Sequence, residues 1–397
     1  MSNSALPPAP FASRIRSIDI ARGAVMVLMA IDHVRVYSGV PAGGVTADVF
    51  LTRWVTNFCA PAFVFFAGVS IFLHAQKLRG ASAQSRWLFL RGAWLVLLEL
   101  TFLRLAWTFN IDFAHYMLAG VIWMLGWCMI LMGLLVRLPV WVNAVFGMAI
   151  VAGHNIIPLI IGGSAQSIAN GSLGWLWRIL YFGGGIAIGG GAEPNFFVLY
   201  SLIPWIGVMS AGYAFGAILR MPSERRNRIC YAIGVTAILA FLVLRYFNIY
   251  GDRPWIPGAR VPAWISFLNT SKYPASFLFL LMTLGPTIVV LPLLEKAHGR
   301  IARWLTIFGR TPLFYYLLHI PLIHAAAVGI SLVRTPSATR WLFTNHPVRP
   351  DDVPQGYTWS LGLLYLVTAS VVFVLYFACR RFAEFKARRK DAWLSYL

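Results

Sequence analysis

The sequence predicts an all-α fold, a polytopic integral membrane bundle of about ten transmembrane helices with one further re-entrant or interfacial segment. The composition supports this prediction in two ways. Hydrophobic residues make up 59% of the 397-residue chain and charged residues only 12%, whereas soluble domains carry about 25% charged residues. The 28 Phe, 16 Trp and 15 Tyr residues are typical of membrane interfaces. An ordinary soluble enzyme is therefore excluded.

Apolar stretches long enough to cross a bilayer define the elements in order. We expect helices at residues 17–38, 50–74, 88–108, 115–136, 139–161, 196–219, 229–249, 274–294, 304–330 and 358–379. The stretch 174–191 is apolar but short, rich in glycine and interrupted by Arg178, so we expect it to be the re-entrant or interfacial segment. The resulting organisation is an N-terminal arm (1–16), a transmembrane domain (17–380) and a basic tail (381–397).

The charges predict the orientation of the chain in the membrane. The chain carries 33 Lys and Arg residues against 13 Asp and Glu, a net charge of +20. The basic residues form short clusters between apolar stretches, such as Arg220 to Arg228 and Arg380 to Lys390. The positive-inside rule explains these clusters better than a nucleic-acid partner does. We therefore expect a multi-pass protein of the bacterial inner membrane, in contact with lipids, with both termini in the cytoplasm.

The four cysteines lack metal-ligand spacing, so no metal site is expected. The first apolar stretch has no small-residue cleavage site and is expected to remain as a signal anchor. Whether the protein forms oligomers stays open.

Ionisable side chains are concentrated in the first predicted helix, where burial in lipid is costly and function is the default interpretation. Eleven positions separate Arg22 from His33, which corresponds to about three turns plus 20° and a rise of about 16 Å. The two residues therefore share one face, with Met26 and Met29 between them and Tyr37 one turn beyond. This stripe suits a long, thin ligand with a phosphate at one end and a reactive carbonyl group at the other.

A structural interpretation of the same stripe is also open. The methionines could simply pack against neighbouring helices, and Arg22 could extend its charged group to the inner membrane interface. His33 could cap the outer end of a helix that has no catalytic role. Asp32 is adjacent to His33 in sequence but points about 100° away around the helix. It is a weaker catalytic candidate, and it could pair with Arg35 three residues later or with a neighbouring helix.

Other predicted helices contribute further candidates. His319 lies at about the depth of His33, and a structural role between helices is the alternative for it. Arg310 and Arg91 could bind phosphate together with Arg22. Arg91 could equally be one of the basic residues that set the orientation of the chain in the membrane. Glu99 could neutralise Arg22 or Arg310.

Four residues of the outer half, where an acceptor would enter, are candidates for binding it: Tyr37, Asn110, Trp123 and Lys272. Glu99 and Arg104 lie about 140° apart on one helix, so we expect each to find a partner on another helix.

The segment SIDIARGAVMVLMAIDHVR resembles the first helix of heparan-alpha-glucosaminide N-acetyltransferase-like proteins. The spacing of Arg22 and His33 also resembles the first-helix signature of the wider acyltransferase-3 superfamily. Further similar segments, spread over nearly the whole chain, are TNFCAPAFVFFAG, RGAWLVLLE, HN, YSLIPWIGVMSAGY, KYPASFLFLLMTLGP and GRTPLFYYLLHIPLIH. The resemblance implies a polytopic acyltransferase that takes an acyl group, expected to be acetyl, from cytoplasmic acyl-CoA to a sugar amine or hydroxyl group outside.

Acyl transfer needs a base for the acceptor and hydrogen-bond donors for the oxyanion. We expect His33 to be the base, since imidazole titrates near neutral pH. Covalent transfer through the ring of His33 stays open as an alternative. A secondary transporter of a small polar or anionic solute is the alternative function, because buried charges and helix-breaking residues also occur in carriers. The chain lacks two visibly related halves, and this favours the acyltransferase.

Overall fold

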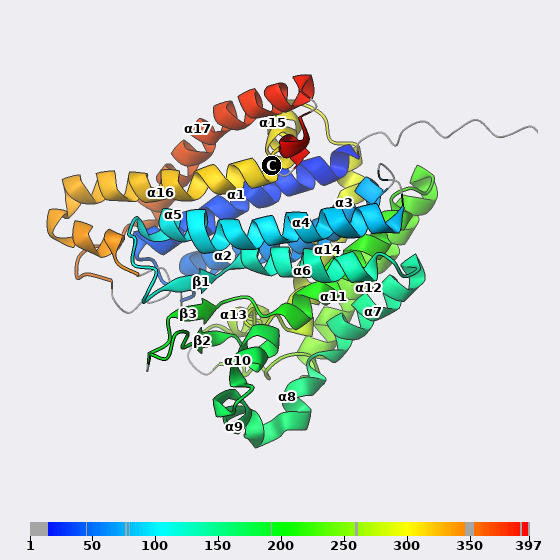
Figure 1. The fold of residues 1–397 in the computed structure, drawn as a ribbon, viewed down its shortest axis with the longest axis horizontal. Helices are drawn as coiled ribbons and strands as arrows, with labels where there is room; N and C mark the ends of the chain where they lie inside the picture. Colours follow the sequence, from blue (N-terminus) through cyan, green and yellow to red (C-terminus); the bar gives the residue numbers. More distant parts are fainter. Residues whose placement is uncertain are drawn as a thin grey trace, which may run out of the picture.

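The computed structural model describes residues 15–44, 46–75, 78, 80–191, 193–258, 261–345, 353–389 and 391–395. The predicted N-terminal arm lies almost entirely outside these residues, as do Lys390 and residues 396–397 of the predicted tail. The described part is a bundle of helices with one small sheet at its side (Figure 1).

The first half of the chain forms elements up to the small sheet. They are α1 (Arg16–Ser38), α2 (Ala47–Trp54), α3 (Cys59–Ala75), α4 (Ala81–Leu98), α5 (Arg104–Thr108), β1 (Met117–Ala119), α6 (Val121–Leu135), α7 (Val140–Gly153), α8 (Ile156–Ile161), α9 (Ala165–Asn170), α10 (Gly174–Trp177), β2 (Gly184–Ile186) and β3 (Phe196–Val198). A 3-10 turn, Val55–Phe58, joins α2 to α3, and a π-helical turn, Glu99–Leu103, joins α4 to α5.

The second half is helical throughout its named elements. They are α11 (Leu202–Ile218), α12 (Ser223–Tyr246), α13 (Ala263–Leu268), α14 (Phe277–Glu295), α15 (Arg300–Arg310), α16 (Pro312–Arg334) and α17 (Leu361–Arg388). The end of α17 and the start of α1 lie at the same end of the molecule (Figure 1).

Five described helical stretches are long and apolar enough to cross a membrane, judged by length and composition. They are Ala47–Ala75, Ser223–Tyr246, Phe277–Glu295, Pro312–Arg334 and Leu361–Arg388. A sixth is counted if Val140–Gly153 and Ile156–Asn170, which meet at 48°, form one broken span. This count is smaller than the ten crossings that the apolar pattern predicts. α1 is 23 residues long, but it carries five charged residues, and α6 and α11 are shorter apolar helices.

The prediction of a purely helical fold needs correction, because β1, β3 and β2 form a three-stranded sheet. β1 runs parallel to β3, with Met117 opposite Phe196, and β2 runs antiparallel to it, with Gly184 opposite Val198. The predicted helices 115–136 and 196–219 therefore begin later than expected, at α6 and α11. Runs of three residues are too short for hydropathy to distinguish a strand from a helix end.

The segment expected to be re-entrant or interfacial, 174–191, contains α10, a π-helical turn (Arg178–Phe182) and β2. Its glycines supply the left-handed backbone between the turn and the strand, since Gly183 has φ 71° and Gly184 has φ 94°.

Two predicted helices are broken in the structure. The stretch 304–330 divides into α15 and α16 at Thr311, because Pro312 starts a new helix and cannot continue the previous one. The stretch 139–161 divides into α7 and α8.

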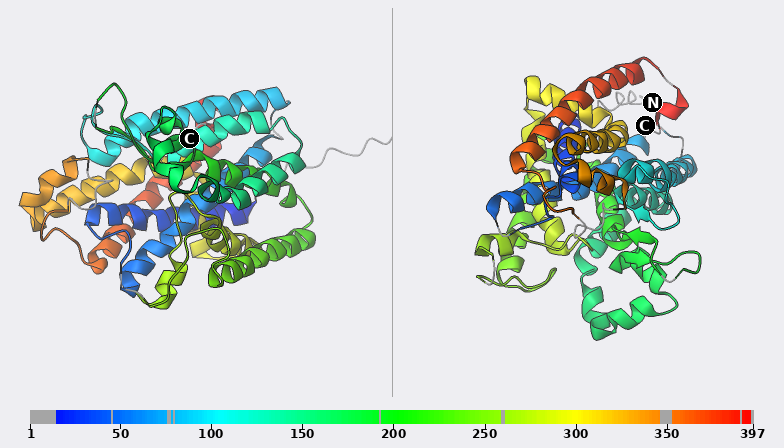
Figure 2. Two further views of the ribbon diagram at one scale, coloured as in Figure 1. Left: turned by 90° about the horizontal axis from the view of Figure 1, so that it is seen from below. Right: turned by 90° about the vertical axis from the view of Figure 1, so that its left-hand side faces the viewer.

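Glycines allow the closest helix contacts. A Cβ atom at Gly126 of α6 would overlap the carbonyl oxygen of Gly92 on α4, and a Cβ atom at Gly92 would overlap the carbonyl oxygen of Gly126. Figure 2 shows α4 and α6 side by side along one flank of the bundle. α1 approaches α15 in the same way, since Gly23 faces the backbone of Leu305 and Gly309 faces the backbone of Asp19. Small residues at such crossings bring the backbones together, as is usual in membranes.

Candidate active site

The centre of the site is a contact between two histidines from distant parts of the chain. The Nδ1 atom of His33 on α1 lies 2.6 Å from the Nε2 atom of His319 on α16. The two rings are stacked, with centroids 4.8 Å apart and an interplanar angle of 24°. His319 is completely buried, and Trp107 packs edge-on against His33 at 4.9 Å. The structure thus brings the two predicted catalytic histidines together.

The hydrogen bonds of His319 assign the protons of the neutral pair. Nδ1 of His319 lies 2.7 Å from the carbonyl oxygen of Tyr316 and 3.2 Å from that of Tyr315. A carbonyl oxygen only accepts, so Nδ1 of His319 carries the proton and its Nε2 atom has the lone pair. His33 must then donate from Nδ1 to that lone pair. The Nε2 atom of His33 is consequently left with an unprotonated lone pair, which is the form that a general base requires.

Asp32, also predicted to be catalytic, bonds to guanidinium groups. Nε of Arg35 lies 3.1 Å from Oδ1 of Asp32, and Nη1 of Arg53 lies 3.5 Å from Oδ2. The pairing with Arg35 agrees with the spacing of three residues along α1. Arg53, which comes from α2 and also bonds to Thr56, was not identified from the sequence. These bonds assign Asp32 to a charge network beside the histidine pair.

Lys272, predicted to bind the acceptor, lies close to this network. It is only 8% exposed, its ammonium group lies 5.5 Å from the ring centre of Tyr273, and it acts electrostatically on both Asp32 and His33. Asp252 fixes the loop that carries Lys272, because its carboxylate accepts hydrogen bonds from the backbone N–H and the hydroxyl group of Ser271 at 2.9 and 2.6 Å. The structure therefore gathers four predicted residues at this end of α1.

The other three predicted acceptor-binding residues have structural contacts of their own. The Tyr37 hydroxyl group donates to the carbonyl oxygen of Trp107 at 2.8 Å. Asn110 donates to the carbonyl oxygen of Phe343 at 2.8 Å. Trp123 is 3% exposed and packs edge-on against Phe196. Among the described residues, none of these contacts is to the histidine pair itself.

Glu99 finds its partner on another helix, as expected, whereas Arg104 does not. Glu99 neither pairs with Arg22 nor with Arg310; its Oε2 atom accepts the backbone N–H of Ile122 at 3.2 Å, at the start of α6. Arg104 was expected to bind another helix, but it binds the loop that follows its own helix. Its guanidinium group donates to the carbonyl oxygens of Tyr116, Asn110 and Asp112 at 3.0, 2.6 and 2.5 Å. Backbone groups that are left unsatisfied at helix starts and in loops thus serve as the partners of these two buried charges.

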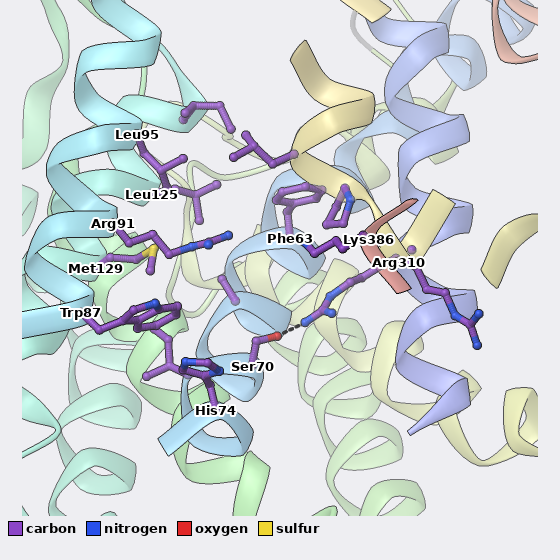
Figure 3. Close-up of a pocket in the computed structure, with 17 residues that line it drawn as sticks. Phe63, Ser70, His74, Trp87, Arg91, Leu95, Leu125, Met129, Arg310 and Lys386 are labelled. Atoms are coloured by element: carbon purple, nitrogen blue, oxygen red, sulfur yellow. Dashed lines mark hydrogen bonds between the residues drawn. The ribbon is translucent and has the colours of Figure 1, made fainter. Parts of the chain in front are cut away.

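A cavity of about 390 Å³ lies towards the other end of α1. Its lining includes the three arginines predicted to bind phosphate, Arg22, Arg91 and Arg310, together with Lys386 from α17 (Figure 3). Among the described lining residues there is no Asp or Glu. Arginine guanidinium groups without competing carboxylates are well suited to bind phosphate.

Further residues of this cavity were not identified from the sequence. Arg22 donates to the carbonyl oxygen of Phe66 at 2.7 Å and to the hydroxyl group of Ser70. His74 stacks on Trp87 with centroids 4.3 Å apart, and Arg91 lies over the Trp87 ring at 5.4 Å. In an apolar helix, nothing in the sequence pattern marks aromatic residues or Ser70 as part of a binding site. Lys386 belongs to the basic tail, whose Lys and Arg residues are expected to set the orientation of the chain in the membrane.

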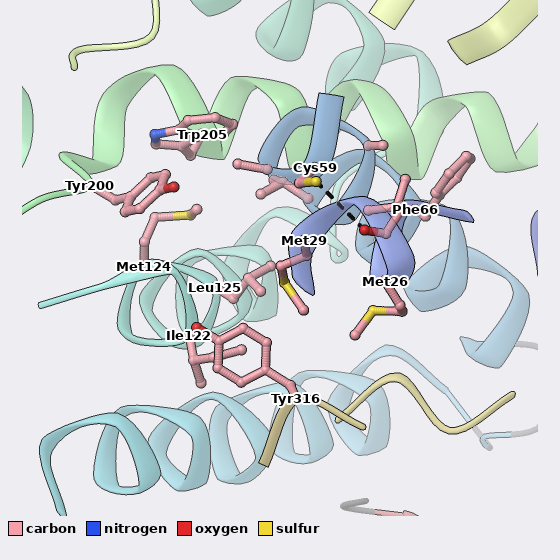
Figure 4. Close-up of a cluster of buried hydrophobic side chains, with 14 of the residues drawn as sticks. Met26, Met29, Cys59, Phe66, Ile122, Met124, Leu125, Tyr200, Trp205 and Tyr316 are labelled. Carbon is pink, nitrogen blue, oxygen red and sulfur yellow. Dashed lines mark hydrogen bonds between the residues drawn. The ribbon is translucent and has the colours of Figure 1, made fainter. Parts of the chain in front are cut away.

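The apolar side chains between the two ends are closely packed. Met26 is completely buried and Met29 is 6% exposed. Figure 4 shows both in a cluster with Phe66, Ile122, Leu125 and Tyr316. Ile122 and Leu125 also line the cavity, so the cluster fills the space between the cavity and the histidine pair. The predicted apolar track exists as packed side chains, of which the methionines are the most adaptable.

A comparison with protein families places this geometry in context. The family model for the catalytic part of heparan-alpha-glucosaminide N-acetyltransferase matches residues 14–251, more than half of the chain. The matched part contains Arg22, Asp32, His33 and Arg91, whereas Lys272, Arg310 and His319 follow it. No curated protein matches the chain significantly. The chain thus belongs to the heparan-alpha-glucosaminide N-acetyltransferase catalytic-domain family, whose name describes a transferase of acetyl groups.

Proposed function

We propose that the protein is a membrane-bound acyltransferase that moves an acetyl group from cytoplasmic acetyl-CoA to a glycan amine or hydroxyl group on the other side of the membrane. One observation carries this proposal: α1 places Arg22 in a cavity lined by four cations and His33 in a partly buried histidine pair, near its opposite ends. A cationic cavity at one end and a base at the other match the two ends of an acyl-CoA thioester.

The donor's phosphate groups would bind in the cavity. Arg22, Arg91, Arg310 and Lys386 supply positive charge there without a described carboxylate in the lining. The acyl end would extend along Met26 and Met29 towards His33. Because this region is packed, we expect the methionine side chains to change rotamer when the donor binds.

The chemical step uses the Nε2 atom of His33. The acceptor's O–H or N–H proton passes to this atom while the acceptor's lone pair attacks the thioester carbon, and the C=O electron pair moves onto oxygen. Collapse of this intermediate breaks the C–S bond, and the leaving thiolate takes the proton back from His33. His319 orients His33 and stabilises the imidazolium through the 2.6 Å contact. Attack by His33 itself, followed by transfer from an acyl-imidazole, uses the same atoms in two steps.

The acceptor would enter beside Lys272. Tyr273 is 43% exposed, and together with Pro274, Ser201 and Phe197 it lines a second cavity of about 170 Å³. An aromatic wall with nearby polar groups is suited to bind a sugar ring.

The proposed orientation follows from the basic clusters. The positive-inside rule supports cytoplasmic termini in a bacterial inner membrane, and we propose that α1, α6 and α11 cross together with the five long apolar helices. The remaining two of the ten crossings would be the helix made of α4, its π-helical turn and α5, and the bent pair beginning with α7.

A transfer assay tests the proposed function. The full chain in lipid nanodiscs is mixed with radiolabelled acetyl-CoA and with glucosamine or glucosamine oligosaccharides. We expect label to enter the sugar, and His33→Ala to abolish transfer while the protein still binds acetyl-CoA. His115→Ala, in a side chain that is 81% exposed, is the matched control and should retain activity. Robust counterflow of a sugar or anion across vesicles without any CoA ester would instead favour a transporter.

A further inference from the structure

Tyr316 lies next to both histidines of the site. It is on α16, three residues before His319, so the two side chains share one face of the helix. Its ring is edge-on to His33, with centroids 6.0 Å apart at 89°, and to His319, at 5.0 Å and 66°. The residue is 2% exposed. A phenol group in this position contacts the pair without taking part in its hydrogen bond.

The side chain of Tyr316 extends into the apolar cluster that contains Met26 and Met29. In Figure 4 it reaches from α16 towards Ile122, on the same side of the cluster as Met26 and Met29. Ile122 is part of the cavity lining. Tyr316 therefore contacts His33 and belongs to the apolar cluster that borders the cavity.

The hydroxyl group of Tyr316 differs from those of two other buried tyrosines, Tyr37 and Tyr357. Tyr37 donates to the carbonyl oxygen of Trp107, and Tyr357 donates to that of Tyr37 at 2.7 Å. No hydrogen bond of the Tyr316 hydroxyl group is found within the described ranges. An acceptor atom of a bound molecule at this point would take this hydrogen bond without displacing a protein partner.

We propose that the Tyr316 hydroxyl group donates a hydrogen bond to the thioester carbonyl oxygen of the bound donor and is a catalytic residue of the transfer. This inference rests on the proposed function. When the acceptor attacks the carbonyl carbon, the C=O pair moves onto oxygen, and the Tyr316 O–H stabilises that negative charge without giving up its proton. The proton from the acceptor goes to His33, and the C–S bond breaks as the carbonyl re-forms. Tyr316 thus supplies the oxyanion donor that the histidine pair lacks.

Infrared spectroscopy tests this contact without knowledge of the acceptor. The full chain in nanodiscs is mixed with acetyl-CoA labelled with carbon-13 at the carbonyl. We expect the carbonyl band of the bound donor to lie at lower wavenumber than that of the free donor, because a hydrogen bond weakens the C=O bond. Tyr316→Phe should move the band back towards the free value. Replacing Tyr316 by 3,5-difluorotyrosine, a stronger donor, should move it further down.

The adjacent tyrosine provides a matched control. Tyr315 is also completely buried and also contacts His319, with centroids 5.3 Å apart. Its hydroxyl group likewise has no partner among the described residues, but its ring packs against Phe308, on α15. Tyr315→Phe should leave the band unchanged. In the transfer assay, Tyr316→Phe should lower kcat by about 100-fold, the usual effect of removing one oxyanion donor, with little change in KM for acetyl-CoA.

The outcomes separate this inference from the proposed function. A band that is the same in the wild-type protein, Tyr316→Phe and the fluorinated protein overturns the role of Tyr316, even if transfer occurs. If acetyl-CoA does not bind the wild-type protein at all, the proposed function fails, and the role of Tyr316 fails with it. If Tyr316→Phe does not fold, the test rests on the fluorinated protein alone. The carbonyl band of its bound donor must then lie at lower wavenumber than in the wild-type protein, or the inference is wrong.

Discussion

The Nδ1 atom of His33 and the Nε2 atom of His319 lie 2.6 Å apart, although 286 positions separate the two residues in the chain. The carbonyl oxygens of Tyr315 and Tyr316 fix the proton on the far side of His319. Those two carbonyls therefore determine which nitrogen of His33 is free to accept a proton. This relationship is the basis of the first prediction.

His319 should act as a positioning residue for His33. We expect His319→Ala to lower kcat for transfer by about 10- to 100-fold, within the usual contribution of general base catalysis, and to leave KM for acetyl-CoA nearly unchanged. His319→Gln, whose side-chain oxygen can accept from His33, should recover part of the loss. Equal losses in the Ala and Gln proteins, accompanied by lower thermal stability in both, would instead indicate a structural role.

The four cations of the cavity should bind the phosphate end of the donor. We expect Arg310→Met and Lys386→Met each to weaken acetyl-CoA binding by about 10-fold or more, since a charge-assisted hydrogen bond contributes about 1.5–3 kcal/mol. Acetyl-pantetheine, which lacks the nucleotide, should bind both variants as it binds the wild-type protein. Calorimetric titration measures both affinities, with Arg334→Met at the exposed end of α16 as the control. Equal weakening for both donors would contradict the assignment.

Glu99 should stabilise the start of α6. Because its carboxylate accepts the N–H of Ile122, Glu99→Ala leaves that donor without its partner and should cost about 1–2 kcal/mol, the usual range for a lost helix cap. Glu99→Gln keeps an acceptor oxygen and should cost less. Thermal unfolding in detergent measures the difference, with Glu224→Ala, in a side chain that is 89% exposed, as the control. An unchanged midpoint for Glu99→Ala would show that the cap contributes nothing.

The α4–α6 crossing should not tolerate a larger residue. A Cβ atom at Gly126 would lie 2.6 Å from the carbonyl oxygen of Gly92, so Gly126→Ala must separate the helices and should cost about 1–3 kcal/mol. Gly329, on α16, has open space around its position, and Gly329→Ala should be neutral or stabilising by up to about 1 kcal/mol. α4 also carries Arg91 and Trp87, so donor affinity should fall only in the first variant. Thermal unfolding in detergent measures both effects. Equal unfolding midpoints for Gly126→Ala and Gly329→Ala would contradict the close crossing.

Helical periodicity was sufficient to predict which residues share a face. The eleven-residue spacing of Arg22 and His33, and the pairing of Asp32 with Arg35, depend only on positions along one helix. Estimated depth in the membrane placed His319 near His33, which the structure bears out.

Contacts between helices could not be predicted in the same way. Arg53, Tyr316 and Lys386 reach the two ends of the site through crossings that no periodicity specifies. Glu99 and Arg104 bind backbone groups, and the sequence does not show where backbone groups are left unsatisfied. The short strands were missed because three residues carry too little pattern.

The most direct test of the central claim is a cryo-electron microscopy map of the full chain in nanodiscs with acetyl-CoA. We expect density for the nucleotide phosphates among Arg22, Arg91, Arg310 and Lys386, and for the acetyl carbonyl group beside Tyr316 and His33. Met26 and Met29 should have moved to admit the connecting arm. Nucleotide density at any other place, or an acetyl group that stays in the cavity far from the histidine pair while transfer proceeds, would contradict it.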